Sequence, residues 1–329
     1  MSARAEPLVS FVTPFYNTAA YLAECIESVM RQTYRRWEYV LVDNQSTDGS
    51  SDLALSYAAR DPRIRVVRNT AFLTQVQNYN RALEQVAPAS VYTKMVEADN
   101  WIHPDCLTQM VALAEAHPRV GLVGSYSTTE RTVRFLGLPQ ATSVVPGREL
   151  VRMHYLNDAY LFGAPTTLLM RSSAVRSRRP FYDESTWLVE DLSACYELLR
   201  EWDFGFVHQI LTFVRTDNES ILSGRRAFDP MALDRMAALT RHGRDFLTPE
   251  EYARVYRRTR GHYYDRLADG VLQRQGAAYW KYHRDGLAEL GSRLELGRLW
   301  AHVAAEVARM AANPGRSLKA LVRSLGSQS

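Results

Sequence analysis

Cysteine is scarce in this 329-residue chain, which contains only Cys25, Cys106 and Cys195 and no CxxC pair. A sparse, odd-numbered set of cysteines argues against a disulfide framework and against a structural zinc site. We therefore expect the three thiols to be small buried side chains in a protein of a reducing compartment.

Long apolar runs are also absent. No stretch reaches the roughly 20 apolar residues that a membrane-spanning helix needs, and residues 1–7 lack the apolar core of a signal peptide. We therefore expect a cytoplasmic protein that can also lie peripherally at the inner face of the cell membrane. The formal net charge is only +4, so the composition does not demand a nucleic-acid partner.

A glycine-rich phosphate loop is missing after the first apolar run, because residues 14–20 contain neither glycine nor a basic side chain. This absence argues against a Rossmann dehydrogenase, whose GxGxxG motif would stand there. It argues equally against a nucleotidyltransferase that makes nucleotide sugars. What the chain does contain is 46% apolar residues, enough for a sizeable core.

Short apolar runs alternate with stretches of helical periodicity in the first part of the chain. Strands are expected at residues 9–13, 37–42, 64–67, 91–96, 120–125, 166–170 and 204–214, and helices from residues 18 and 52 and at 76–86, 104–117 and 191–202. This alternation predicts an α/β fold with a mostly parallel twisted sheet flanked by helices. A loop is expected at residues 128–146.

Beyond residue 227 the sequence becomes arginine-rich and helical, without strands. We therefore predict two domains, residues 1–226 and a C-terminal helical region of residues 227–329. Within the latter, residues 296–311 place Leu296, Trp300, Val303, Val307 and Met310 on one helical face. That face suits packing on the first domain or on a second subunit, and it also suits an anionic membrane surface.

Polar clusters follow the first two expected strands, where ligands of parallel sheets bind. After the first strand come Pro14, Tyr16 and Asn17. Tyr16 could present its ring to a base; alternatively, the segment only turns the chain and Asn17 caps the next helix. After the second strand, Asp43 could accept hydrogen bonds from a base or a ribose, and the loop that follows is turn chemistry in which Gly49 takes a positive φ.

Carboxylates follow the fourth strand and open a later helix. Glu97 and Asp99 are two positions apart, so on an extended loop both face one site. Two such carboxylates suit a divalent cation that also binds a diphosphate. Glu190 and Asp191 stand at a helix N-terminus; they are either partners of the helix dipole or a general base for an acceptor hydroxyl.

Residues 8–199 resemble the family 2 inverting glycosyltransferases, which have the GT-A fold. The resemblance rests on PFYN at 14–17, on QT and DNQSTDGS within residues 28–50, on QNYN at 77–80, on EADNW at 97–101 followed by Pro104 and Asp105, and on Glu190-Asp191. It implies that the first domain is catalytic. It also implies transfer of a hexosyl or N-acetylhexosaminyl group from a nucleoside-diphosphate sugar to a saccharide or lipid-linked saccharide, in cell-surface polysaccharide or glycoconjugate biosynthesis. UDP is the favoured nucleotide, and GDP and dTDP stay open.

The resemblance further implies a role for each matching residue. Donor-binding residues would be Pro14, Tyr16, Asn17, Asp43, Asn78, Glu97, Ala98 and Asp99. Asp99, with Glu97, would hold Mg²⁺ or Mn²⁺. Asp191 would be the catalytic base, with Glu190 either placing the acceptor or supporting Asp191, and Gly163, Ala164 and Pro165 would line the reaction centre.

Four positions depart from the family pattern. Glu97 and Asn100 stand where the acidic motif usually has Asp, and Asn44 replaces a common second Asp. Asn80 replaces a usual Gly, and Asn tolerates a positive φ. The altered acidic motif leaves one alternative open, a non-catalytic glycosyltransferase-like protein that binds a nucleotide or acts as a scaffold. The sequence does not decide whether the chain forms a homo-oligomer.

Overall fold

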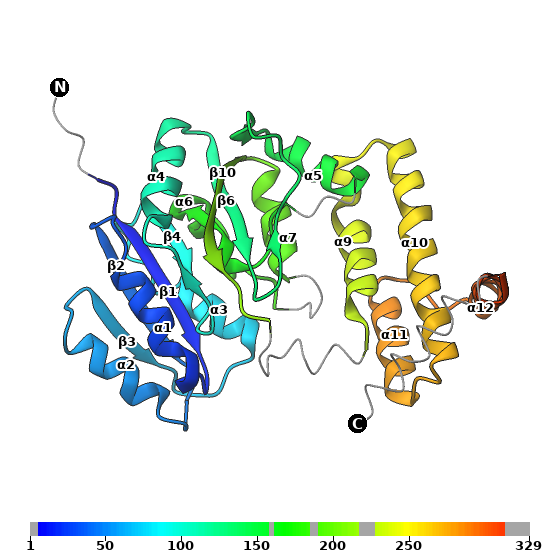
Figure 1. The fold of residues 1–329 in the computed structure, drawn as a ribbon, viewed down its shortest axis with the longest axis horizontal. Helices are drawn as coiled ribbons and strands as arrows, with labels where there is room; N and C mark the ends of the chain where they lie inside the picture. Colours follow the sequence, from blue (N-terminus) through cyan, green and yellow to red (C-terminus); the bar gives the residue numbers. More distant parts are fainter. Residues whose placement is uncertain (1–5, 158–160, 185–189, 217–227, 313–329) are drawn as a thin grey trace. The chain divides into compact units, whose positions relative to one another are not determined.

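The computed structural model describes residues 6–157, 161–184, 190–216 and 228–312 (Figure 1). The chain divides into two compact units, Met1–Asn218 and Glu219–Ser329. The domain boundary expected at residue 227 falls in 217–227, outside the described residues.

A mixed sheet organises the first unit. Its strands lie in the order β3 (Ile64–Arg68), β2 (Trp37–Asp43), β1 (Val9–Phe15), β4 (Tyr92–Met95), β9 (Leu169–Arg171), β6 (Val120–Thr128), β10 (Asp203–Phe213) and β5 (Trp101–Ile102). The pairs β1–β2, β2–β3, β1–β4 and β6–β10 are parallel, whereas β9 runs antiparallel between β4 and β6. The predicted α/β class with a mostly parallel sheet is confirmed.

Helices flank this sheet (Figure 1). They are α1 (Ala19–Met30), α2 (Ser50–Ala58), α3 (Gln75–Leu83), α4 (Cys106–Ala116), α5 (Gly147–Asn157), α6 (Ser172–Arg176) and α7 (Glu190–Leu199). The helical spacing in α1 buries Leu22 and Ile26 completely, and each buried side chain of this kind contributes roughly 1.5–3 kcal/mol. The three cysteines are free and buried, as predicted.

Two expectations about irregular segments are wrong. The strand expected at residues 166–170 begins only at Leu169, because the 3₁₀ helix η1 (Pro165–Thr167) precedes it. Pro165 fixes φ at a helical value, and the Thr167 N–H bonds back to the Ala164 carbonyl at 2.9 Å. The loop expected at residues 128–146 contains two short strands, β7 (Val133–Arg134) and β8 (Val144–Val145), which pair with β6 and β10.

The register of the central strands brings the predicted site segments to one edge. In β1 and β2, Phe15 lies opposite Asp43. On the other side of β1, the Val96 N–H donates to the Val12 carbonyl at 3.0 Å, directly before the acidic motif. The loops after β1, β2 and β4 therefore meet at the carboxyl end of the sheet.

The second unit is helical throughout its described part, with α9 (Pro230–Phe246), α10 (Pro249–Leu272), α11 (Ala277–Glu289) and α12 (Leu296–Ala312). On α12, which contacts α10, Leu299 and Val303 are buried, whereas Leu296, Trp300 and Val307 are exposed. Of the single apolar face expected there, Val303 is therefore buried, whereas Leu296, Trp300 and Val307 face solvent. Within the described chain, no helix is long and apolar enough to cross a membrane.

Candidate active site

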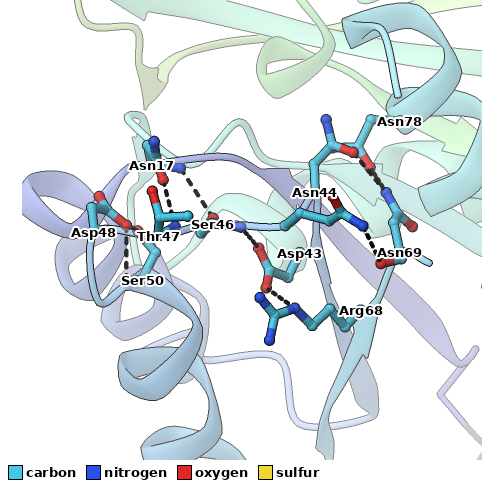
Figure 2. Close-up of polar contacts among 11 residues, drawn as sticks. Asn17, Asp43, Asn44, Ser46, Thr47, Asp48, Ser50, Arg68, Asn69 and Asn78 are labelled. Atoms are coloured by element: carbon cyan, nitrogen blue, oxygen red, sulfur yellow. Dashed lines mark hydrogen bonds and ion pairs between the residues drawn. The ribbon is translucent and has the colours of Figure 1, made fainter. Parts of the chain in front are cut away.

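The loops after β1 and β2 hold each other through side chains, and we call Asn17, Asp43, Asn44, Ser46, Asp48 and Ser50 the loop cluster (Figure 2). Asn17 adopts a positive φ of 50°. Its N–H donates to the Ser46 Oγ at 3.1 Å, and its Oδ1 accepts from the Thr47 N–H at 2.8 Å. Asn17 therefore fixes the second loop instead of capping α1, which was the alternative interpretation.

Side chains of the second loop accept hydrogen bonds from the N–H groups at the start of α1 and so cap that helix. The Thr18 N–H donates to the Ser50 Oγ at 2.9 Å, and the Ala19 N–H donates to the Asp48 Oδ2 at 2.9 Å. Burial raises the pKa of Asp48, but hydrogen bonds from Ser50 and Ala19 outweigh it and leave that pKa lowered. Gly49 has a φ of 92°, as the turn chemistry predicted.

Asp43 ends β2 with a fully buried side chain. Its Oδ1 accepts from the Ser46 N–H at 2.8 Å, and its Oδ2 lies 3.4 Å from the Arg68 Nε (Figure 2). Arg68 is largely exposed, so the buried Asp43 carboxylate is paired with a guanidinium that reaches solvent. The carboxylate is held in one orientation and keeps lone pairs for a further donor.

Three asparagine amides connect the loop cluster to α3. The Asn69 Nδ2 donates to the Asn44 Oδ1 at 3.0 Å and to the Asn78 Oδ1 at 2.8 Å (Figure 2). Asn44 also bonds the backbone N–H and carbonyl of Leu73, both at 2.9 Å. Asn44, where an Asp is common in the family pattern, thus supports the segment that leads into α3, because an amide can donate where a carboxylate cannot.

Tyr16 stands on the exposed side of this cluster. Its ring is 46% exposed and meets the exposed Phe72 ring edge-on, with the centroids 4.8 Å apart. Exposed aromatic rings beside a buried carboxylate can bind a flat heterocycle. Pro14, by contrast, is buried within β1.

The acidic motif forms a hydrogen-bonded turn, not the extended loop that was expected. The Asn100 N–H donates to the Glu97 carbonyl at 2.9 Å. Glu97 and Asp99 nevertheless act on each other: burial raises the pKa of Glu97 to about 7, and the negative charge of Asp99 is the next largest cause. Ala98, between them, is buried in the core.

Both carboxylate oxygens of Glu97 are engaged within the protein. Oε1 accepts from the Tyr79 hydroxyl at 2.7 Å, and Oε2 accepts from the Thr166 hydroxyl and the Asn100 amide, each at 3.1 Å. An Asp at position 100 would place a second carboxylate against Oε2, whereas the amide donates to it. Glu97 and Asn100, the two departures from the usual acidic motif, therefore fit each other.

Thr166 holds this turn by hydrogen bonds, and Lys94 in turn holds Thr166. Neither residue was predicted from the sequence to belong to the site. The Thr166 Oγ1 accepts from the Glu97 N–H at 2.9 Å. Lys94 is fully buried in β4, and its Nζ donates to the carbonyls of Thr166 at 2.8 Å and Leu168 at 3.3 Å. Burial lowers the pKa of Lys94. A lysine inside an otherwise apolar strand was the signal in the sequence.

Gly163, Ala164 and Pro165, predicted to line the reaction centre, immediately precede Thr166 and so lie beside the acidic turn. Arg215 closes the other side. Its N–H donates to the Asn100 Oδ1 at 2.9 Å, and its Nε donates to the Asp99 carbonyl at 3.1 Å.

Asp191 lies in the first turn of α7, with Glu190 before it. Burial raises the pKa of Asp191 above its usual value, although the Leu192 N–H and the positive charge of Arg134 oppose the rise. The charge of Asp191 also raises the pKa of Glu97. Asp191 at the start of α7 is therefore near enough to Glu97 for their charges to interact. We call Glu97, Asp99, Asn100, Thr166 and Asp191 the acidic cluster.

A divalent cation fits the chemistry of this cluster. Across the described ranges, no three His, Cys, Asp or Glu side chains are arranged as a complete protein metal site. Mg²⁺ is commonly bound by one or two carboxylates together with substrate phosphates. The mutual repulsion of Asp99 and Glu97 marks negative charge that a cation would offset.

The comparisons with known proteins agree on one family. The sequence model of glycosyl transferase family 2 matches residues 10–179, just over half of the chain. The putative glycosyltransferase EpsE of Bacillus subtilis (strain 168) is 28% identical over 225 residues, which are 68% of this chain and 77% of that protein. Other curated relatives align over as little as 13% of their own length, and the chain spans less than two thirds of most of them.

Solved structures share the fold at low identity. S. aureus TarS in complex with UDP-GlcNAc superposes with a TM-score of 0.63 at 15% identity, over 86% of this chain and 80% of that one. The mannosyltransferase PcManGT from Pyrobaculum calidifontis, in complex with GDP-Man and Mn²⁺, superposes with a TM-score of 0.57 at 16% identity, over 95% and 83%. The arrangement of the sheet and its flanking helices is thus that of these GT-A enzymes.

Proposed function

This chain belongs to glycosyl transferase family 2, and on that premise we propose that it is an inverting glycosyltransferase that uses a UDP-sugar and an acceptor hydroxyl. The observation that carries the proposal is the acidic cluster, where the charges of Asp99 and Asp191 both raise the pKa of the half-buried Glu97. A carboxylate whose pKa is raised by burial and by neighbouring carboxylates is typical of sites that perform chemistry.

Asp191 is the proposed general base. Its carboxylate accepts a proton from the acceptor hydroxyl as that oxygen attacks the anomeric carbon on the face opposite the diphosphate. One displacement then inverts the anomeric configuration. Burial raises the pKa of Asp191 toward the working pH, which favours proton acceptance in the transition state. Glu190, beside it, is the proposed contact for the acceptor.

Asp99 is the proposed ligand of Mg²⁺ or Mn²⁺, an ion that when bound would neutralise charge on the departing nucleoside diphosphate. Glu97 is proposed to lie behind Asp99 and shape the turn, because Tyr79, Thr166 and Asn100 occupy its oxygens. Mn²⁺ in the PcManGT structure, which shares this fold, supports the proposal.

The loop cluster is the proposed site of the nucleoside. Asp43 would accept a hydrogen bond from the base, and the exposed rings of Tyr16 and Phe72 would contact it. The remaining residues expected there, Pro14, Asn17 and Asn78, support these loops. UDP is favoured by the UDP-GlcNAc bound to TarS, and the GDP-Man bound to PcManGT makes GDP the competing nucleotide.

A thermal-shift titration tests this assignment. The protein is heated with UDP, GDP or dTDP, each with Mn²⁺ or EDTA, beside the Asp99→Asn variant. A nucleotide at about 100 times its Kd stabilises the folded state by roughly 2.7 kcal/mol. We expect the largest shift with UDP and Mn²⁺, lost in Asp99→Asn. A metal-independent response to all nucleotides, together with no turnover, would instead support the scaffold alternative.

We also propose that α12 contacts an anionic lipid surface, which would suit a lipid-linked saccharide acceptor. Leu296, Trp300 and Val307 are exposed on it, and residues 307–329 contain four basic and no acidic residues. We expect co-sedimentation with vesicles of phosphatidylglycerol, but not of phosphatidylcholine, and a loss of binding in Trp300→Ser. Concentration-dependent dimers lost in the same variant, without vesicle binding, would assign the face to a second subunit.

A further inference from the structure

One turn of α3 contacts both the acidic turn and the segment that precedes the Glu190-Asp191 pair. The side chains that make these contacts are consecutive, Tyr79 and Asn80. Asn80 stands where the family pattern usually has Gly, but it lies within α3 and is not among the residues with a positive φ. The backbone at this position therefore needs no positive φ, so the tolerance of Asn for such a φ does not explain the residue, and its side chain has another role.

The Asn80 amide binds the backbone of Tyr182 in both directions. Its Nδ2 donates to the Tyr182 carbonyl at 2.9 Å, and its Oδ1 accepts from the Tyr182 N–H at 2.8 Å. The same Nδ2 donates to the Glu184 Oε1 at 2.9 Å. Both Asn80 and Tyr182 are at least 95% buried. The side-chain amide thus satisfies both backbone groups of Tyr182, as a neighbouring strand would, and so fixes the position of that residue.

Tyr79 connects the same point to the acidic turn. Its hydroxyl donates to the Glu97 Oε1 at 2.7 Å, and its ring meets the Tyr182 ring edge-on, with the centroids 5.9 Å apart. Tyr182 in turn lies near both carboxylate groups. Burial raises its pKa, and the charges of Cys195, Asp191 and Glu97 raise it further, in that order.

We propose that Tyr79 and Asn80 are positioning residues that set the distance between the acidic turn around Asp99 and the base Asp191 by holding Tyr182 between them. The inference rests on the proposed function of Asp99 and Asp191. Neither Tyr79 nor Asn80 has to touch the substrates. Transfer requires the donor phosphate site and the base to be held at a fixed separation, and a displacement of about 1 Å can cost 10²-fold in rate.

The test compares Asn80→Ala with Arg81→Ala, its neighbour on α3, which is partly exposed and pairs only with Glu84 in the described contacts. We expect Asn80→Ala to lower kcat by about 10- to 100-fold while the donor Kd stays within about threefold. Hydrogen exchange at the Tyr182 amide should become faster. Arg81→Ala should leave all three quantities unchanged. Asn80→Ser keeps a hydroxyl that can accept from the Tyr182 N–H and brings no charge against the Glu184 carboxylate, so it serves if Asn80→Ala does not fold.

The outcomes separate this inference from the proposed function. Unchanged kcat in both Asn80 variants overturns the inference, and so does a loss of donor affinity equal to the loss of kcat, which would place the contact in the donor pocket. If the unaltered protein transfers no sugar, the proposed function fails. In that case exchange at the Tyr182 amide decides alone, and protection that is unchanged in the Asn80 variants overturns the positioning role.

Discussion

In the loop cluster, hydrogen bonds lower the pKa of a carboxylate, whereas in the acidic cluster burial and neighbouring negative charge raise the pKa of another despite its hydrogen bonds. Asp48 accepts three hydrogen bonds and its pKa is lowered. Glu97 also accepts three, yet burial and the charge of Asp99 raise its pKa to about 7. Three accepted hydrogen bonds thus accompany a lowered pKa in one cluster and a raised pKa in the other.

The difference follows from exposure and from neighbouring charge. Asp48 is exposed and its donors are helix N–H and hydroxyl groups, which favour the charged form. Glu97 and Asp191 are largely shielded from solvent, where the charged form is disfavoured. The loop cluster therefore stabilises the loops of the proposed nucleoside site, whereas the raised pKa values of Glu97 and Asp191 are of the kind found at sites that perform chemistry.

Replacing the proposed base should give the largest effect. Asp191→Asn removes the proton acceptor but keeps the shape, so we expect kcat to fall on the order of 10²- to 10⁴-fold with the donor Kd unchanged. The measurement is steady-state transfer beside a direct binding titration. Asp52→Asn, an exposed carboxylate in the first turn of α2, is the control. Near-normal turnover of Asp191→Asn would contradict the assignment and leave Glu190 as the candidate.

Within the loop cluster, a substitution should change binding more than rate. Asp43→Asn keeps an acceptor for the Ser46 N–H but removes the charge that faces Arg68. A hydrogen bond to a charged group contributes about 1.5–3 kcal/mol, so the Kd for UDP should rise about 10- to 100-fold. Asp48→Asn, in the same loop, should lower thermal stability and leave that Kd unchanged. Equal losses of affinity in both variants would mean that Asp43 only supports the loop.

Lys94 tests how the acidic cluster is supported. Lys94→Met leaves the buried carbonyls of Thr166 and Leu168 without their donor, so we expect the free energy of unfolding to fall by about 1–3 kcal/mol. Denaturant unfolding measures this change. Lys281→Met removes an exposed lysine that pairs with Asp285 and should cost no more than about 0.5 kcal/mol. A stability of Lys94→Met equal to that of the unaltered protein would show that η1 does not depend on Lys94.

The two regions also differ in how well the sequence predicted them. Strand ends, Gly49 and the position of Asp43 follow from local patterns, because apolar periodicity and turn residues act over a few positions. The roles of Asn80 and Lys94 do not, because their partners are 102 and 72 positions away. The pairing of Glu97 with Asn100 was likewise not predicted, because in the sequence each residue is only a departure from the usual Asp. The hydrogen bond from the Asn100 amide to the Glu97 Oε2 shows that the two residues fit each other.

The smallest effect should come from removing a positive charge that acts on Asp191, the proposed base. Arg134, in β7, lowers the pKa of Asp191 and so opposes the rise that burial causes. In Arg134→Ala that pKa should therefore rise further. A base works only when deprotonated, so activity is lost as pH falls through its pKa, and a higher pKa moves this loss to higher pH. The profile of kcat against pH measures the midpoint of the acid limb in both proteins.

Arg60→Ala provides the control for that profile, because Arg60 follows the C-terminal end of α2, lies over the Tyr57 ring and is not among the causes of the Asp191 shift. Its acid limb should coincide with that of the unaltered protein. The hydrogen bonds that Asp48 accepts should persist throughout the acid limb, because the pKa of Asp48 is lowered and these bonds are lost only at a pH below its usual value. An acid limb in Arg134→Ala that moves to lower pH would mean that the titrating base is not Asp191.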